Sequence, residues 1–516
     1  FQSEKDHVNL QYRTLTVILP DASTHIQQFA AGELQQHLAE LTRKPVAIMT
    51  DAAARGKEAF PFFIGTEFAQ APMTLADGGA HYRISSTGVH LYGNDRVREQ
   101  HERPERTALA SRNTTGTLAA VYCFLERECG IKWLWPGTDG TLLPDSAPLT
   151  LTPTRYTWKP AVALRNLVLN GSLPQYMTNN RLFRISCELR NSVSEYASAT
   201  IDEMLWLRRH RVLQTTAQED RLSVAIPAGV SPEKLDRIIH SIRKNTGEKT
   251  VIDVLPETPG LLLPAGNHRL TATRIDALLE AEKTGIRYHL PTSRGTLNRL
   301  SRYMAAKTLS GAENSQTVWT HEFCSAFGAA AMDVLEYFDY WQGHFNRTFR
   351  GRYAELTENG YGHWSHGVMR NASDYYSLAD FQQSAMALDR ALQWPLTDLQ
   401  KERLQQLLIT HHHAELTFLA LKTACETPAS PSRLTKDLRI MRRLQTFRMQ
   451  FAVELGVPIN SISLLERQLG DVTGADWEKL FLDAEPVKRL PLTWLFKYDR
   501  ENAGFAEEWY QKNVDT

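Results

Sequence analysis

The sequence of 516 residues lacks the short motifs that mark several common enzyme classes. It contains no phosphate-binding loop, no dinucleotide-binding glycine fingerprint, no Cys-x-x-Cys pair and no His-Glu-x-x-His motif. His321-Glu322 is not followed by the second histidine that a zinc protease needs. The sequence therefore supports neither dinucleotide chemistry nor metal proteolysis, and we expect no metal site and no cofactor.

An excess of charge of either sign is also absent. Lys and Arg together number 58, and Asp and Glu together number 58, so the formal net charge is zero. This balance removes the overall electrostatic attraction to nucleic acid or to an anionic membrane surface. No run of apolar residues approaches the ~18 that a membrane-spanning helix requires. We therefore expect no nucleic-acid partner and no membrane partner.

Cysteine is scarce, with five residues scattered along the chain, and an odd number predicts no disulfide framework. Cys123 and Cys129 lie six positions apart on one predicted helix and point to different faces, so they cannot bridge each other. Buried thiols are the simplest interpretation.

The length exceeds the ~250 to 300 residues of a single hydrophobic core, so two to three domains are expected. The first three residues match the end of a tag-protease recognition site and are set aside. Residues 4–157 predict an α/β sandwich domain. Its expected elements are a strand at 14–20, a helix opening at Asp21-Ala22-Ser23, strands at 46–49 and 61–65, a hairpin turning at 86–88, and a helix at 117–129 that Gly130 ends.

The last helix of this domain carries a resemblance. The run Gly-x-x-x-Ala-x-Tyr-x-Phe-Leu-Glu begins at Gly116. The sequence Cys-Gly-Ile-Lys-Trp begins at Cys129, and a strand is predicted at 131–135. It resembles the end of the small N-terminal domain that precedes the barrel in bacterial α-glucuronidases and hexosaminidases. It is most similar to an uncharacterised family of bacterial glycoside-hydrolase-like proteins related to them. The resemblance covers residues 14–170 and 295–345, and it implies a supporting domain, a barrel and a helical region.

Repeated βα units are predicted for residues 158–310, as in a (β/α) barrel. The candidate strands lie at 162–171, 211–216, 221–229, 250–260 and 285–293, and one intervening helix is expected at Thr271 to Lys283. Five strands are recognisable where a complete barrel has eight, and the region is shorter than the ~200 residues that such a barrel needs. The barrel is therefore predicted to be either incomplete, with segments absent from this sequence, or degenerate.

Residues 311–490 predict an α-helical region whose helices carry clear N-terminal caps, among them Ser377 with Asp380 and Thr397 with Gln400. The aromatic alternation of residues 491–516 resembles the first strand of a β-sandwich appended to many glycosidases.

Glycosidic bond hydrolysis usually needs two carboxylates, and barrels place them at the C-terminal ends of strands. On this criterion Asp253, within a predicted strand, and Glu257, just after it, are the candidate catalytic pair. A surface loop acid is the alternative interpretation of Glu257. Glu219 and Asp220 are weaker candidates, because the element around them is uncertain.

Six further residues are candidates for binding substrate hydroxyls or a substrate carboxylate, although each alone is more often structural. They are Arg165, Asn170, Arg181, Tyr288, His289 and Trp364, the last in a glycine-rich loop with neighbouring histidines.

The densest histidine cluster lies at His411, His412 and His413. Helical projection places two of these rings and Glu415 on one side, together with leucines. A carboxylate close to a histidine either orients a ligand or satisfies a buried ring, and we favour the structural interpretation.

The residues and the resemblance together predict an exo-acting glycoside hydrolase whose partner is a carbohydrate, possibly with removal of an acidic sugar. The acidic sugar, a uronic or sialic acid, is implied by the resemblance to α-glucuronidases alone, as is a secreted or periplasmic bacterial protein. For a sialic acid, Tyr288 would replace a carboxylate as nucleophile. The alternative is a non-catalytic glycan-binding protein on the same scaffold.

Overall fold

The computed structural model describes most of the first 425 residues. The described ranges are 7–54, 58–69, 74–144, 149–161, 165–169, 201–214, 222–226, 250–254, 263–264, 266–280, 285–290, 296–312, 315–349 and 372–425, with a few single residues at 237–240 and 440–451. Glu257, Asn170, Arg181 and Trp364 lie outside them, as does the predicted β-sandwich strand at 491–516.

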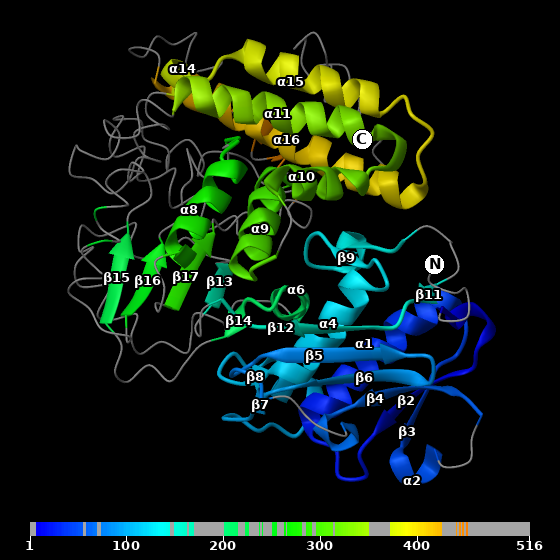
Figure 1. The fold of residues 1–516 in the computed structure, drawn as a ribbon. Coiled ribbons are helices and arrows are strands. Elements are labelled where there is room, and N and C mark those ends of the chain that lie inside the picture. Colours follow the sequence, from blue (N-terminus) through cyan, green and yellow to red (C-terminus); the bar gives the residue numbers. More distant parts are fainter. Residues whose placement is uncertain are drawn as a thin grey trace, which may run out of the picture.

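A six-stranded sheet forms the N-terminal part, with the strand order β12-β5-β6-β4-β2-β3 (Figure 1). β5 runs antiparallel to both β6 and β12, whereas the other pairs are parallel. The strands predicted at 14–20, 46–49 and 61–65 and the hairpin turning at 86–88 are thereby confirmed, and β12 forms one edge of the sheet. The strands are β2 (Leu15–Leu19), β3 (Ala47–Thr50), β4 (Phe60–Ile64), β5 (Ala80–Ser85), β6 (Gly88–Gly93) and β12 (Thr154–Trp158).

The helices α1 (His25–Thr42) and α4 (Gly116–Arg127) pack on each other and on this sheet. The predicted start of the first helix at Asp21 is too early, because Thr24 is the N-cap: its hydroxyl accepts from Gln27 N at 3.2 Å. The second helix ends just before Gly130, whose φ of 74° is left-handed as predicted. Short elements complete this part: β1 (Val8–Asn9), α2 (Asp51–Ala54), β7 (Asp95–Arg96), α3 (Pro104–Leu109), β8 (Thr114–Thr115), β10 (Thr141–Leu142) and β11 (Thr150–Leu151).

A second sheet has the strand order β14-β13-β17-β16-β15. β13, β17, β16 and β15 are parallel, and the short β14 is antiparallel to β13. All five strands predicted for the barrel region are confirmed, with tighter bounds. They are β13 (Arg165–Leu169), β14 (Leu213–Gln214), β15 (Leu222–Ile226), β16 (Thr250–Val254) and β17 (Gly285–Leu290).

The described strands of this second sheet form an open sheet, so closure into a barrel stays a prediction. Its first long strand, β13, lies next to its last, β17, while β15, β16 and β17 follow one another in chain order. A barrel brings first and last strands together in this way.

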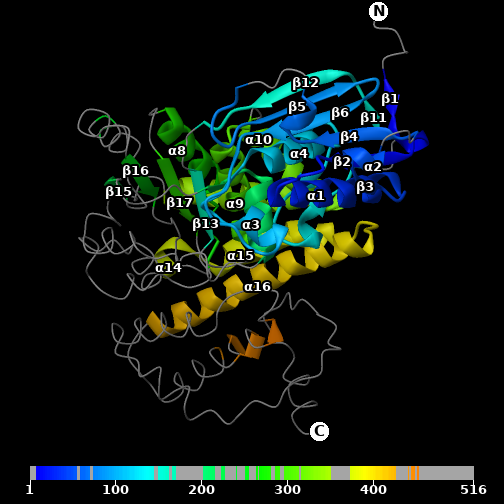
Figure 2. The ribbon, with the colours of Figure 1, turned by 90° about the horizontal axis from the view of Figure 1, so that it is seen from below.

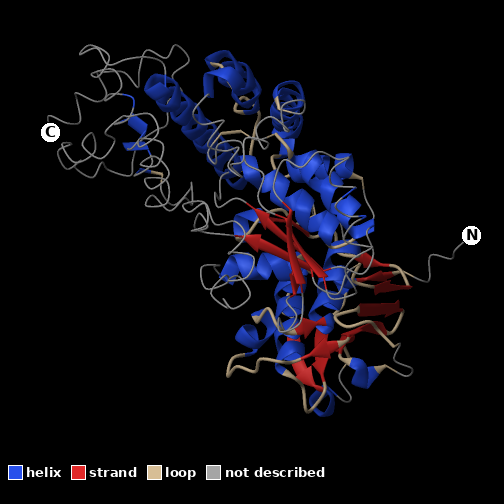
Figure 3. Ribbon diagram, turned by 90° about the vertical axis from the view of Figure 1, so that its left-hand side faces the viewer, coloured by secondary structure: helices blue, strands red, loops and turns tan. Residues whose placement is uncertain are grey.

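Helices cover the remainder of the described chain. The predicted helix at Thr271 is observed as α8, which begins slightly earlier. α11 packs against α15 and α15 against α16, above the second sheet in Figure 3. α16 runs as one long helix across the molecule in Figure 2. The helices are α6 (Ile201–Arg209), α8 (His268–Glu280), α9 (Thr296–Leu309), α10 (Gln316–Ser325), α11 (Ala331–Thr348), α14 (Ala372–Tyr375), α15 (Leu378–Ala391) and α16 (Asp398–Cys425).

Two predicted caps of the helical region are confirmed, and a third, at Ser430 before Pro431, lies outside the described residues. Ser377 and Asp380 form a capping box at α15, and Thr397 and Gln400 exchange hydrogen bonds at the start of α16. Across the described residues, no helix is both long enough and apolar enough to cross a bilayer.

The two cysteines of α4 and its end, and the histidine cluster of α16, are buried in the core. Cys123 and Cys129 are buried free thiols, as predicted. His411 meets the hydroxyl of Tyr337 at 3.1 Å, and Nδ1 of His412 lies 3.2 Å from a Glu415 carboxylate oxygen. These contacts within the core support the structural interpretation of the cluster.

Backbone carbonyls on both sides of α4 connect the N-terminal domain to α6, which leads into the second sheet. The predicted strand at 131–135 shortens to β9 (Lys132–Trp133), because the Trp133 carbonyl faces α6 instead of continuing a ladder. That carbonyl accepts from Trp206 Nε1 at 3.0 Å and from His210 Nε2 at 2.7 Å. The buried Arg208 guanidinium donates to the carbonyls of Ala110, at 2.5 Å, and Leu213, at 2.7 Å. Side chains at the end of α6 thus tie β14 to the N-terminal domain.

A buried ionic cluster at the end of α4 makes the same connection. One carboxylate oxygen of Glu126 lies 2.9 Å from Arg211, and the other accepts from Lys307 on α9. Burial opposes ionisation of Glu126, but the charges of Lys307 and Arg211 outweigh it, so its pKa lies well below its usual range. Three segments from distant parts of the chain therefore share one charge-compensated contact.

Replacing Glu126 with Gln is expected to destabilise the protein by about 3 to 5 kcal/mol, because two buried cations lose their shared countercharge. The measurement is urea unfolding at pH 7. Glu336→Gln is the matched control: this carboxylate is largely exposed and pairs with Arg390, so its loss should cost at most about 1 kcal/mol. Equal effects of the two substitutions would contradict the assignment.

The same cluster predicts a pH dependence. The pKa of Glu126 is lower in the folded protein than in the unfolded chain, where it is about 4.3. Its contribution is therefore fully present above the unfolded pKa and is lost as the pH falls towards the folded pKa. Between pH 5 and pH 3 the wild type should lose more stability than the Glu126→Gln variant, measured by thermal unfolding in parallel.

Candidate functional site

The candidate site is the edge of the second sheet where its parallel strands end. Register places Leu169 beside Leu290, Val254 beside Tyr288, and Ile226 beside Val254. The carboxyl ends of β13, β17, β16 and β15 therefore meet at one edge. In parallel α/β folds this edge is where ligands bind and catalytic residues lie.

Asp253 is the penultimate residue of β16 and so lies close to this edge. It is level with Ala225 on β15 and with Arg287 on β17. Neighbours in register belong to the same face of a sheet, and so do residues two apart on one strand. Asp253, Arg287 and His289 therefore share one face.

The same face extends to β13, where Asn166 is level with Arg287. The positions of an acid, a guanidinium, an imidazole and an amide thus follow one another across three adjacent strands. Asp253 and His289 were predicted from the sequence, whereas Arg287 and Asn166 were missed. The signal for Arg287 was present in the alternation of GIRYHL, where Arg and His are two positions apart.

Tyr288 belongs to the opposite face. It is only 1% exposed, makes a side-chain hydrogen bond with Thr271 of α8, and lies near the charge of Arg274. Burial raises the pKa of Tyr288, which is the reverse of what activates a phenolate nucleophile. This placement disfavours Tyr288 as a substrate contact or nucleophile.

Arg165 lies on that helix-covered face as well. It is level with Ile286, which is fully buried two positions before Tyr288. The structure therefore separates the sequence-predicted residues into two sets, with Asp253 and His289 on one face and Arg165 and Tyr288 on the other.

The other candidates lie outside the described residues, namely Glu257, Asn170, Arg181 and Trp364, as do Glu219 and Asp220. Asn170 directly follows the end of β13, and Glu257 follows β16 by three positions. The predicted separation of ~5 to 9.5 Å between the Asp253 and Glu257 carboxyl groups stays a prediction.

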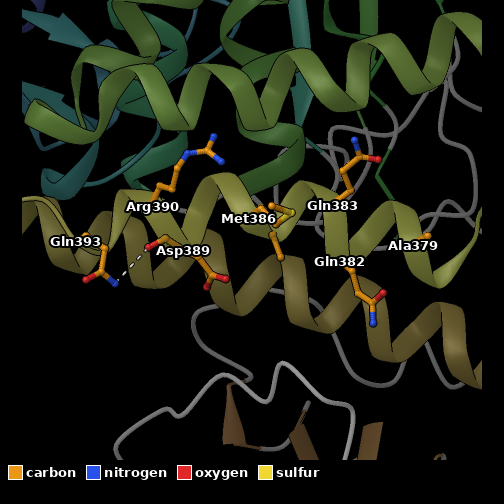
Figure 4. Close-up of a pocket in the computed structure, with 8 residues that line it drawn as sticks. Ala379, Gln382, Gln383, Met386, Asp389, Arg390 and Gln393 are labelled. Carbon is orange, nitrogen blue, oxygen red and sulfur yellow. Dashed lines mark hydrogen bonds between the residues drawn. The ribbon is translucent and has the colours of Figure 1, made fainter.

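A cavity of about 780 Å³ runs along α15, away from this edge. Its described lining comes from that helix, including Gln382, Met386 and Asp389, and from Gln393 just after it (Figure 4). Arg390 points from this helix towards α11, where it pairs with Asp333 at 2.9 Å and with Glu336. The described lining has one carboxylate, whereas glycoside hydrolysis usually needs two, so these residues do not suit that reaction.

Comparison with solved structures gives a match over most of the chain. A 4-O-methyl-α-glucuronidase of glycoside hydrolase family 115, with specificity for decorated arabinogalactans, matches with a TM-score of 0.50 and 9% identity, over 95% of this chain and 82% of that one. The fold is similar to that of glycoside hydrolases. No family model matches the sequence, and no curated protein matches it.

Two further glycoside hydrolases match with lower TM-scores. A family 84 protein has a TM-score of 0.33 and 10% identity, over 92% of this chain and 97% of that one. A family 138 enzyme targeting pectin rhamnogalacturonan II has a TM-score of 0.34 and 7% identity, over 89% of this chain and 74% of that one.

The burial of Tyr288 gives a direct test. Tyr288→Phe should keep activity on the best glycoside substrate within about twofold, because the ring lies on the helix-covered face. It should lower the free energy of unfolding by about 1 kcal/mol, since the hydrogen bond with Thr271 is lost. A loss of activity of ~10³ with unchanged stability would instead identify Tyr288 as a nucleophile.

Proposed function

We propose that this protein is a glycoside hydrolase acting on the ends of oligosaccharide or polysaccharide chains. The observation that carries the proposal is the shared face and edge of Asp253, Arg287 and His289, on a fold similar to glycoside hydrolases. Glycosidic bond hydrolysis usually uses carboxylates, which barrels place at such strand ends, and a neighbouring guanidinium and imidazole suit a polar, hydroxyl-rich substrate.

In this mechanism Asp253 is one of two carboxylates that flank the scissile bond. Its partner is Glu257 in our proposal, which the chain places just beyond the same strand. One group protonates the leaving oxygen, and the other attacks the anomeric carbon or activates water. We assign Asp253 the second of these roles, because its position is level with that of Arg287 on the neighbouring strand.

The proposed sugar is acidic, a uronic or a sialic acid. Arg287 supports this choice, because a guanidinium binds a carboxylate through two parallel hydrogen bonds. The fold similarity to an α-glucuronidase is consistent with it, although such similarity concerns the scaffold alone. A second strand position on the same face, His289, adds a donor for sugar hydroxyls or for the same carboxylate.

The first experiment defines the activity. Aryl α- and β-glycosides of uronic, sialic and neutral sugars, together with xylan and arabinogalactan oligosaccharides, are incubated with the full chain, and released sugar is quantified. We expect a single terminal monosaccharide to be released. Binding of an oligosaccharide without release of any sugar across the panel would favour the alternative, a non-catalytic glycan-binding protein.

Asp253→Asn should lower kcat on the best substrate by ~10² or more, because the amide keeps the shape of the side chain but neither ionises nor donates a proton as an acid. The free energy of unfolding should change little. The matched control is Asp398→Asn, at an exposed acid that begins α16, which should keep wild-type kcat. Wild-type kcat in both variants would place the catalytic groups elsewhere.

Arg287→Gln tests the acidic sugar separately. Loss of the guanidinium should raise KM for a uronide or sialoside about tenfold or more, and it should change KM for a neutral glycoside by less than twofold. Arg155→Gln, at an exposed position on β12, is the control. An equal effect on neutral and acidic substrates would reject recognition of a sugar carboxylate by Arg287.

A further inference from the structure

A cavity of about 550 Å³ lies between the N-terminal domain, α6 and the helical region, and its described lining includes no strand residue of the second sheet. Its walls come from α1, the segment 137–143, α6 and the first turn of α16. The volume falls within the ~300 to 1,000 Å³ of small-molecule sites. Junctions between domains are also where such sites often form.

Hydrogen bonds hold the walls of this cavity in place. Arg209 on α6 reaches Glu33 on α1 at 3.1 Å, and the Tyr122 hydroxyl donates to the same carboxylate at 2.9 Å. On the other side, Arg403 on α16 donates to the carbonyls of Asp139, at 2.8 Å, and Thr141, at 3.0 Å. A cavity with walls fixed in this way costs little to organise when a ligand enters.

The positive charges at the cavity are already engaged by the protein. Arg209 neutralises Glu33, and Arg403 donates to backbone carbonyls. The carboxylates of Glu40 and Asp202 also line the cavity, so acids outnumber bases there. A hydrogen bond from His37 lowers the pKa of Glu40, which keeps that group an acceptor at neutral pH. An anionic ligand is therefore disfavoured, whereas a hydroxyl-rich neutral ligand finds acceptors.

His37 lies between two of these carboxylates. Its Nδ1 lies 3.3 Å from Glu40, so the proton on that nitrogen is held by the carboxylate. Its Nε2 has no hydrogen-bond partner within the described part of the chain and lies 4.0 Å from a Glu33 oxygen. The ring is only 2% exposed and this nitrogen is closed off from the cavity, so His37 holds the Glu40 carboxylate in place and does not itself bind the ligand.

The remaining lining combines amides and hydroxyls with aliphatic side chains. Gln36, Gln400 and Thr138 offer donors and acceptors, while Leu143 and Leu205 form an apolar wall. Sugar rings present this same combination of hydroxyl edges and apolar C–H faces.

We propose that this cavity is a second glycan-binding site that holds one or two neutral sugar units. It is separate from the sheet edge at Asp253, and it excludes the acidic sugar expected there. The choice of a saccharide over another polyhydroxylated molecule rests on the proposed function. The site would hold a neutral part of the chain whose acidic end is hydrolysed, or a neighbouring chain of the same polysaccharide.

The test measures binding and needs no hydrolysis. Glucose, galactose, mannose and xylose, with glucuronic acid and glucosamine as charged counterparts, are offered to the full chain in saturation-transfer NMR and titration experiments. We expect at least one neutral sugar to bind in the millimolar range. Leu143→Trp should weaken that binding at least tenfold by filling the cavity. Leu392→Trp, at another exposed leucine of similar exposure outside the lining, should leave it unchanged.

A second variant guards against misfolding of the first. Asp202→Ala removes an acceptor at an exposed position without adding bulk, and it should weaken neutral-sugar binding severalfold at unchanged melting temperature. Asp253→Asn should leave this binding intact, so loss of hydrolysis and loss of this site are distinguishable. The proposal is overturned if no neutral sugar binds, if only glucosamine or glucuronic acid binds, or if Leu143→Trp and Asp202→Ala both bind as the wild type does.

Discussion

The structure depends on the compensation of one buried negative charge. Glu126 lies in the last turn of α4 in the N-terminal domain, and its two oxygens meet Arg211, just after α6, and Lys307, near the end of α9. Removing an ion from water costs several kcal/mol, so each of these groups needs a countercharge in the folded state. Lys307 also lies 3.7 Å from Glu322, whereas Glu126 is the carboxylate that links it to Arg211. The contact therefore holds three segments together at once.

Further contacts near Glu126 join the N-terminal domain to segments next to the second sheet. Trp206 of α6 and His210, just after it, also bind the Trp133 carbonyl, while Trp158 donates from β12 to the Ser310 carbonyl at 3.0 Å. β14 follows α6 directly and pairs with β13, whose other neighbour is β17. These contacts join the domain directly to segments that flank the second sheet. Among the charged residues of the domain, Glu126 serves this connection and Glu33 the walls of the junction cavity.

Part of the candidate site was predictable from the sequence, because a carboxylate near the end of an apolar β-branched run is a local pattern. Asp253 was found in this way. Arg287 and Asn166 were not, since their relation to Asp253 depends on which strands are neighbours and in what register. The same register moved Tyr288 to the other face, because the side-chain period of a strand is two and adjacent residues diverge.

The sequence by itself determined the local elements: the left-handed Gly130 after α4, the capping pairs at Ser377 and Thr397, and the five strands of the second sheet. Each of these depends on residues within a few positions of one another. Only the tertiary structure decided the strand order, the cavity at the junction and the partners of Glu126, which lie 85 and 181 positions away. The physical reason is that a buried charge pairs with a countercharge that packing brings close in space. The separation of two residues in the sequence does not show how far apart they lie in the fold.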